Sequence, residues 1–214
     1  MILPDAFVDL ENKLRGKTLL PNNLPPKVVG DAVLSGSIWD IGEVEKRKAA
    51  VLIALINRRH GINILLTERT HDLPSHAGQV AFPGGKVEEG DENIVHTALR
   101  EAKEEVGLEA SFISILGVLD NYHTGTGFDV SPVVGMVEEG FTIVPDMREV
   151  DEVFEVPLSF ILNKDNHVLH SKEYKGAERK FYSMEFEGHT IWGATAAILV
   201  NLCYVLMHYN QTDN

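Results

Sequence analysis

The chain contains a single cysteine, Cys203, among its 214 residues. One thiol cannot supply a disulfide framework or a cysteine-built zinc site within one chain. Basic residues are also scarce: 19 Lys and Arg face 32 Asp and Glu, and the formal net charge is -13. Such a charge repels phosphate backbones and anionic membrane surfaces, so we expect neither nucleic acid nor a membrane as a partner. It also repels any free anionic phosphate compound unless cations screen it.

The sequence has no apolar run of the length that a membrane helix needs. Residues 191–207 are mostly apolar, but the stretch is shorter than about 20 residues, is interrupted by Asn201 and has no Lys or Arg beside it. We therefore expect a buried C-terminal helix. Residues 1–10 contain Asp5 and Asp9 and lack the basic start of a signal peptide, so we expect a cytoplasmic protein.

No internal repeat or low-complexity tract divides the chain, and its length suits one domain. We expect an N-terminal leader at 1–47 that packs on a domain at 48–210. Apolar patterning predicts strands at 49–56, 62–69, 112–119, 130–137, 153–156, 180–186 and 189–192, and helices at 4–15, 91–106, 158–162 and 194–208. This order of elements favours an α+β fold, an α/β/α sandwich with a mixed central sheet.

The helix predicted at 91–106 carries three glutamates close together, Glu101, Glu104 and Glu105. At about 100° per residue, Glu101 and Glu105 share one face and Glu104 lies on its edge, and we expect all three to point away from the apolar stripe. Like charges at this spacing destabilise a helix. A hard divalent cation such as Mg²⁺ would turn the repulsion into coordination, because it prefers oxygen ligands. A solvated acidic face is the alternative.

Two glycines, Gly84 and Gly85, stand shortly before this helix. Glycine lets the backbone bend sharply and come close to a ligand, so the loop and the helix can present a backbone group and several carboxylates to one point. Asp91 is expected to cap the helix and Gly107 to end it.

The segment that joins these features resembles the Nudix box, G-x5-E-x7-R-E-x-x-E-E-x-G. It reads GGKVEEGDENIVHTALREAKEEVGL, in which Gly85, Arg100, Glu101, Glu104 and Glu105 match in type and order, as do the closing Gly107 and Leu108. Two departures are visible: Asp91 stands where the box has glutamate, and eight residues rather than seven separate it from Arg100. The core REAKEEVGL is intact. The resemblance implies the Nudix fold and a diphosphatase.

The longer spacing is similar to that of the coenzyme A pyrophosphatase branch of this family. The upstream segment LLTERTHDLPSHAGQVAFPGG also resembles the signature of that branch, although Pro74 stands where the signature usually has arginine. Further segments that look like the branch are LDNYHTGTGFDVSPVVG, EVDEVFEVPL and IWGATAAIL, so the resemblance covers about 49–207. It implies hydrolysis of coenzyme A to 3′,5′-ADP and 4′-phosphopantetheine, with Mg²⁺ or Mn²⁺ as cofactor.

The resemblance also implies roles for individual residues. Glu101 and Glu105 become the main metal ligands, Glu104 a third ligand or a water-orienting group, and Gly85 the donor of a backbone carbonyl. Arg100 would fix the rotamer of one glutamate from outside the ligand shell. A further carboxylate beyond the box is expected at Glu149, with Glu152 as the alternative. Glu104 or Glu149 would accept the proton of the attacking water, which makes Glu104, Glu105 and Glu149 the catalytic set.

Contacts to the substrate are expected from residues around the loop that contains Gly84 and Gly85. Cationic and imidazole side chains suit its phosphates, and aromatic rings suit an adenine. The candidates are Arg69, His76, Lys86, Phe82, Tyr122 and Phe128, with His123 weaker. For each of them a structural role in the core or at the surface is the alternative.

Three other readings of the chain stay open. The substrate can be another nucleoside diphosphate derivative, such as ADP-ribose, a dinucleotide or a nucleoside triphosphate. The protein can instead be a catalytically silent ligand sensor on the same fold, or a structural metal-binding protein without turnover. A sensor would tend to lose box glutamates or gain a DNA-binding domain, whereas this chain keeps the glutamates. The sequence leaves a homodimer open.

Overall fold

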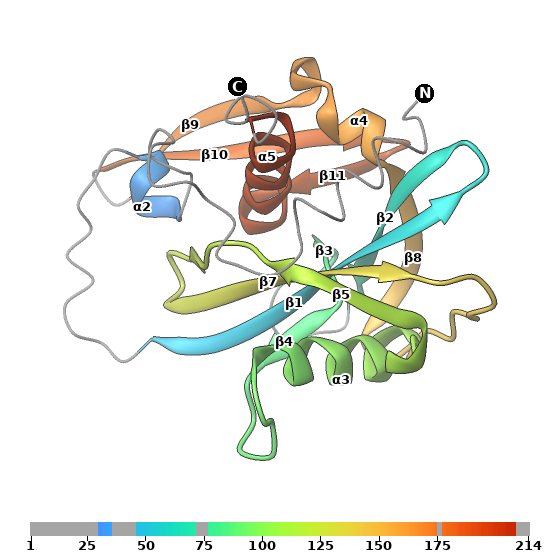
Figure 1. The fold of residues 1–214 in the computed structure, drawn as a ribbon. Helices are drawn as coiled ribbons and strands as arrows, with labels where there is room; N and C mark the ends of the chain where they lie inside the picture. Colours follow the sequence, from blue (N-terminus) through green and yellow to red (C-terminus); the bar gives the residue numbers. More distant parts are fainter. Residues whose placement is uncertain (1–29, 36–45, 72–76, 175–176, 209–214) are drawn as a thin grey trace.

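The computed structural model describes residues 30–35, 46–71, 77–174 and 177–208, and Figure 1 shows their arrangement. His76, Pro74 and the helix predicted at 4–15 lie outside the described residues. Within these ranges no helix is long and apolar enough to cross a membrane.

A mixed sheet occupies the centre of the fold, as the sequence predicts. In the described part of the chain it has eight strands, with a main order of β3-β2-β1-β7-β5, while β4 pairs with β1, β6 with β7 and β8 with β2. Among its paired strands in the described residues, only β1 and β7 run parallel. The strands are β1 (Arg47–Arg58), β2 (Gly61–Arg69), β3 (Val80–Ala81), β4 (Gly84–Lys86), β5 (Ile113–Val118), β6 (Tyr122–His123), β7 (Phe128–Val137) and β8 (Val150–Pro157).

A second sheet and the remaining helices complete the domain. This sheet has the order β11-β10-β9, formed by β9 (Val168–Tyr174), β10 (Ala177–Phe186) and β11 (His189–Trp192). The predicted hairpin is therefore extended by a further strand, β9, which the apolar pattern does not predict. The helices are α2 (Asp31–Leu34), α3 (Ile94–Val106), α4 (Leu158–Leu162) and α5 (Gly193–His208), with 3-10 turns η1 (Ala110–Phe112) and η2 (Lys164–Asn166).

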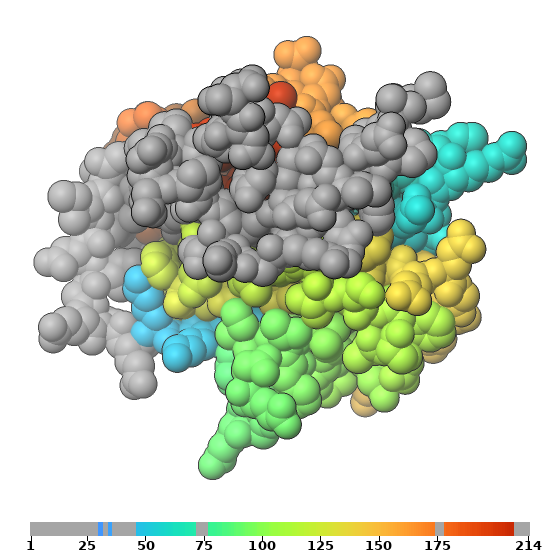
Figure 2. All heavy atoms as spheres, viewed as in Figure 1, coloured from blue at the N-terminus to red at the C-terminus, as the bar shows by residue number. Residues whose placement is uncertain are grey.

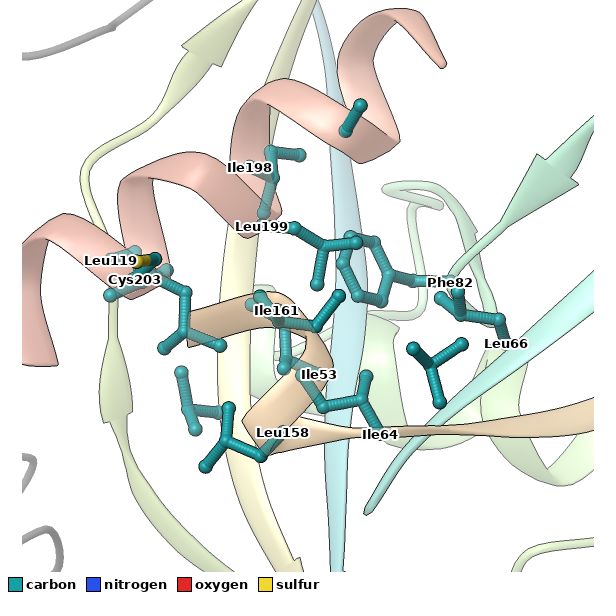
Figure 3. Packing of buried hydrophobic residues seen from close by; sticks show 14 of the residues in the cluster. Ile53, Ile64, Leu66, Phe82, Leu119, Leu158, Ile161, Ile198, Leu199 and Cys203 are labelled. Carbon is teal, nitrogen blue, oxygen red and sulfur yellow. The ribbon is translucent and has the colours of Figure 1, made fainter. Parts of the chain in front are cut away.

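Alternate residues of β1 feed two apolar clusters on opposite faces of the central sheet. Ile53 and Leu55 join the larger cluster, which includes α4 and α5. Leu52 and Ala54 join the smaller cluster under α3. Figure 3 shows the larger cluster, where α5 lies over Ile53 and its neighbours. Because side chains alternate along a strand, one central strand anchors both helical layers.

Candidate active site

Helix α3 carries the glutamates on its last turns, and the structure gives the three carboxylates different surroundings. Ala98, Ala102 and Val106 bury the apolar face of the helix against the sheet. The side chain of Glu104 is 59% exposed, whereas that of Glu105 is only 4% exposed. The expectation that all three point away from the apolar stripe is therefore wrong for Glu105, which lies at the edge of that stripe and turns toward the glycine loop.

Glu105 is a buried carboxylate with two polar partners. Its Oε2 accepts a hydrogen bond from the Gly84 N–H at 3.1 Å, and its Oε1 lies 3.3 Å from Nη1 of Arg69. Burial raises the pKa of Glu105 to about 7, although the Gly84 N–H and Arg69 act in the opposite direction. A buried anion costs free energy unless it is paired, so this position favours a cation beside the carboxylate.

Gly85 brings the backbone of β4 directly against Glu101. Gly84 and Gly85 pair with Val51 and Ala50 of β1 in an antiparallel register. A Cβ atom on Gly85 would lie 2.4 Å from Oε1 of Glu101, so only glycine allows this approach. Burial raises the pKa of Glu101, while Arg100 opposes the shift. The loop and the helix thus meet at two carboxylates, as the spacing predicts.

Arg100 is held by Asp91 and reaches two glutamates. Its Nε and Nη2 donate to the two carboxylate oxygens of Asp91 at 3.0 and 3.1 Å. Its Nη2 also lies 3.0 Å from Oε1 of Glu101, and its Nη1 lies 3.1 Å from Oε2 of Glu104. Hydrogen bonds from Arg100, and then from the Glu88 N–H, keep the pKa of Asp91 well below its ordinary value. Asp91 therefore orients Arg100, which aligns the glutamates.

The prediction that Asp91 caps the helix is wrong. α3 begins at Ile94, and its N-cap is Asn93, whose Oδ1 accepts hydrogen bonds from the N–H groups of Val95 and His96 at 3.0 Å. The carboxylate oxygens of Asp91 instead accept hydrogen bonds from the Arg100 guanidinium and the Thr97 hydroxyl. Gly107 ends the helix in the left-handed conformation at φ 71°, as predicted.

Glu149 and Glu152 are the two carboxylates expected beyond the box, and only Glu149 shares a partner with Glu105. Its Oε2 is 3.9 Å from Nη2 of Arg69, which also contacts Glu105, and its side chain is 50% exposed. Glu152 is directed elsewhere, with its Oε1 3.7 Å from Nε2 of His189. The structure thus brings Arg69, Glu105 and Glu149 together.

A second group of possible ligands, which the sequence does not predict, forms around His189. The ligand atoms of Glu68, Glu152 and His189 lie within 4.8 Å of one another, and Nδ1 of His189 is 3.1 Å from Oε2 of Glu68. Neighbouring residues of a strand face opposite sides of the sheet, so Glu68 is directed away from the face that Arg69 presents to α3. Only the fold joins His189 to strand β2, which is why no local motif signals the group.

A cavity of about 830 Å³ adjoins Gly84 and Gly85 and runs toward the second sheet. Among the predicted substrate residues it is lined by Arg69, Phe82, Lys86 and Phe128, and also by His123. Its other cationic lining residues are Arg47, Arg179 and Lys180, which are not among the predicted substrate contacts. On a chain with a net charge of -13, a cavity with five cationic lining residues suits an anionic ligand.

Tyr122 takes a different position from the one expected for a base-stacking residue. It is 2% exposed, packs in the larger core cluster and is not among the residues that line the cavity. Its hydroxyl makes a short hydrogen bond to Oδ1 of Asp31. Tyr122 therefore supports the cavity wall from the core, and its buried ring cannot stack on a base in this arrangement.

Known proteins provide a comparison for this geometry. The family model of the NUDIX domain matches residues 46–183. An uncharacterized Nudix hydrolase NudL from Yersinia enterocolitica is 41% identical over 154 residues, which cover 72% of this chain and 78% of that protein. NudL of Yersinia pestis is 40% identical over 156 residues, 73% of this chain and 78% of that protein. The MutT protein of Methanosarcina mazei Go1 shares the fold, with a TM-score of 0.50 at 22% identity over 79% of this chain and 100% of that one.

Proposed function

Because the chain belongs to the Nudix hydrolase family, we propose that it hydrolyses the diphosphate bond of coenzyme A or its derivatives to 3′,5′-ADP and 4′-phosphopantetheine. The family assignment makes it an enzyme that acts on a nucleoside diphosphate derivative; coenzyme A is the more specific proposal. The single observation that carries the proposal is the buried Glu105, which faces the Gly84 N–H beside Glu101 where the cavity begins.

The residues at this point fit a divalent cation. Glu101 and Glu105 offer carboxylate oxygens and Gly85 a backbone carbonyl, which together form the hard oxygen set that Mg²⁺ or Mn²⁺ prefers. The burial that raises the pKa of both carboxylates is a cost that a bound cation would offset. In such a site the cation supplies charge neutralisation for the diphosphate and a lowered pKa for a bound water.

The other residues have roles that follow from their positions. Arg69 lies within 4 Å of both Glu105 and Glu149. If Glu105 bound a cation instead, the Arg69 guanidinium would be available to neutralise a phosphate oxygen. Glu149 is the better candidate for the general base. It is half-exposed and can reach a water, whereas Glu104 is tied to Arg100 on the outer side of α3. Arg100 holds Glu101 and Glu104 in place.

The cavity provides the support for a large substrate. Its volume of about 830 Å³ falls in the range of small-molecule sites. Phe82 and Phe128 give it apolar walls, while Lys86 lies near the metal loop and can meet a phosphate. The segments that resemble the coenzyme A branch contribute Phe82, His123 and Trp192 to this same cavity. Localisation in the cytoplasm and assembly as a homodimer remain proposals from the sequence.

The test is a hydrolysis assay on coenzyme A with Mg²⁺ or Mn²⁺, run beside ADP-ribose, a dinucleotide and a nucleoside triphosphate. We expect coenzyme A to have the highest kcat/KM. Glu105→Gln should lower kcat by roughly 100-fold or more, while Glu149→Gln should lower it by about 100-fold and change its pH profile. Glu173→Gln, at an exposed position of strand β9, is the matched control and should behave as wild type.

Each outcome separates the proposals. Robust turnover by Glu105→Gln contradicts its role, and full activity of Glu149→Gln moves the general base to Glu104. Preference for another member of the panel keeps the hydrolase and rejects coenzyme A. A wild-type protein that binds Mg²⁺ and a nucleotide but hydrolyses nothing favours the silent sensor.

A further inference from the structure

The segment just before the domain forms part of the cavity wall. Gly30 makes a parallel bridge with His123, and α2 follows directly. Asp31 and Ser35 both line the cavity, on the side formed by residues 123–126 and strand β10. From the sequence we expected this segment only to pack on the domain.

Both carboxylate oxygens of Asp31 are used. Oδ1 accepts a short hydrogen bond from the Tyr122 hydroxyl, and Oδ2 accepts one from the Gly125 N–H at 2.6 Å. Burial, and then the neighbouring Asp31 carboxylate, raise the pKa of Tyr122 well above its ordinary value, so Tyr122 stays a donor. Hydrogen bonds to a charged acceptor are about twice as strong as neutral ones.

Ser35 extends the same support to the second sheet. Its hydroxyl donates to the backbone oxygen of Asp31 at 2.9 Å and accepts a hydrogen bond from the Lys180 N–H at 3.1 Å. The short segment thus joins the loop at Gly125 to strand β10, and these two elements form neighbouring parts of the cavity wall.

The loop in turn holds a cationic side chain at the cavity. Nη2 of Arg47 donates to the Thr126 backbone oxygen at 2.8 Å, and its guanidinium lies 4.0 Å from the centre of the Phe128 ring. Arg47 and Phe128 both line the cavity. A change in the loop at Gly125 therefore reaches Arg47, which is placed to attract an anionic group.

We propose that Asp31 is a positioning residue of the substrate cavity: by binding Tyr122 and the Gly125 N–H, it fixes the 123–127 loop in the form that binds a nucleotide substrate. Helix α2, which begins at Asp31, lies apart from α3 (Figure 1), so we expect Asp31 not to act on the reacting bond. Its loss should weaken substrate binding and leave the chemical step largely intact. The proposal rests on the nucleotide hydrolase function proposed above.

The test compares Asp31→Asn, Tyr122→Phe and the double variant in the full chain, with Asp165→Asn in the exposed turn η2 as the matched control. An asparagine keeps the shape of the side chain, but it has one acceptor oxygen for the two donors. We expect Asp31→Asn to raise KM for coenzyme A about tenfold with kcat within about twofold, and Tyr122→Phe to raise KM less. The double variant should exceed Asp31→Asn by less than the Tyr122→Phe effect, because the two residues share one hydrogen bond.

A binding measurement separates this proposal from the proposed hydrolysis. Trp192 lines the cavity, so in a Trp39→Phe background its fluorescence reports adenosine 3′,5′-diphosphate without turnover. The dissociation constant of Asp31→Asn should be about tenfold higher than that of its parent. If the wild-type protein binds this probe but cleaves no substrate, the proposed hydrolysis is refuted. The dissociation constants of Asp31→Asn and its parent can still be compared.

Several results would overturn the role of Asp31. An unchanged KM and dissociation constant in folded Asp31→Asn would do so, as would a loss of kcat at constant KM or the absence of a fluorescence response in the parent. If Asp31→Asn fails to fold, Tyr122→Phe decides the question, since it removes one hydroxyl and keeps the ring. An unchanged KM in that variant then rejects the proposal.

Discussion

Helices α3 and α5 pack on opposite faces of the same sheet, but their sequences differ in kind (Figure 1). α5 has no Asp, Glu, Lys or Arg, and apolar side chains on most of its sides are buried. α3 buries a narrow apolar stripe with Glu105 at its edge and presents its other charged side chains outside that stripe, and Figure 2 shows the green segment that contains it at the surface. Helix α5 contributes mainly to stability, whereas α3 places the carboxylates.

The largest effect on stability is expected from truncating a buried side chain of α5. Leu199 is fully buried in the larger cluster, so Leu199→Ala should lower the free energy of unfolding by about 3 kcal/mol. Denaturant unfolding measures the loss. The kcat of the folded fraction should remain near wild type, because the glutamates lie on the other face. A large fall in kcat without a change in stability would contradict the division.

The Asp91–Arg100 pair tests whether α3 also carries stability. The Asp91 side chain is almost fully buried, and Asp91→Asn leaves Arg100 without its main partner, which should cost about 2 kcal/mol at pH 7. Because the fold lowers the pKa of Asp91, its contribution is present above the ordinary pKa of about 3.9 and is lost as the pH falls through the folded pKa. The difference between wild type and Asp91→Asn should therefore shrink below about pH 4. A difference that is constant with pH would contradict the ionic origin.

The neighbouring glycines Gly84 and Gly85 of β4 should separate effects on Mg²⁺ binding from effects on stability. A Cβ on Gly85 meets the end of the Glu101 side chain, so Gly85→Ala should displace that carboxylate and weaken Mg²⁺ binding about tenfold with little loss of stability. A Cβ on Gly84 would lie 2.5 Å from the Ala50 backbone oxygen, so Gly84→Ala should instead disturb the pairing of β1 and β4 and lower stability. Calorimetric Mg²⁺ titration and thermal unfolding distinguish the pair. Equal effects of both on both measurements would refute the distinction.

The sequence predicted much of this arrangement where the signal is local. The strands on either side of residues 59–60 and the short helix at Leu158–Leu162 follow from apolar runs and turn residues, and the convergence of Gly85 on Glu101 follows from the motif spacing. The burial of Glu105 was missed because periodicity cannot tell how far the stripe of α3 is covered by the glycine loop. Strand β9 was missed because its polar residues alternate only weakly. Asp31 and His189 reach their partners over long sequence separations, which no local pattern indicates.

The smallest expected effect concerns the first turn of α3, where the prediction of the cap was wrong. Asn93→Ala removes the acceptor of two N–H groups and should cost about 1 kcal/mol of stability. Glu101 lies about two turns further along the helix, and Asp91 still holds Arg100, so kcat should change by less than about twofold. Asn93→Asp keeps an acceptor and serves as the control, with stability close to wild type. If Asn93→Ala instead lost most of its activity, the glutamates would depend on the start of the helix, and the placing of the carboxylates could not be assigned to the packing of α3 and the glycine loop.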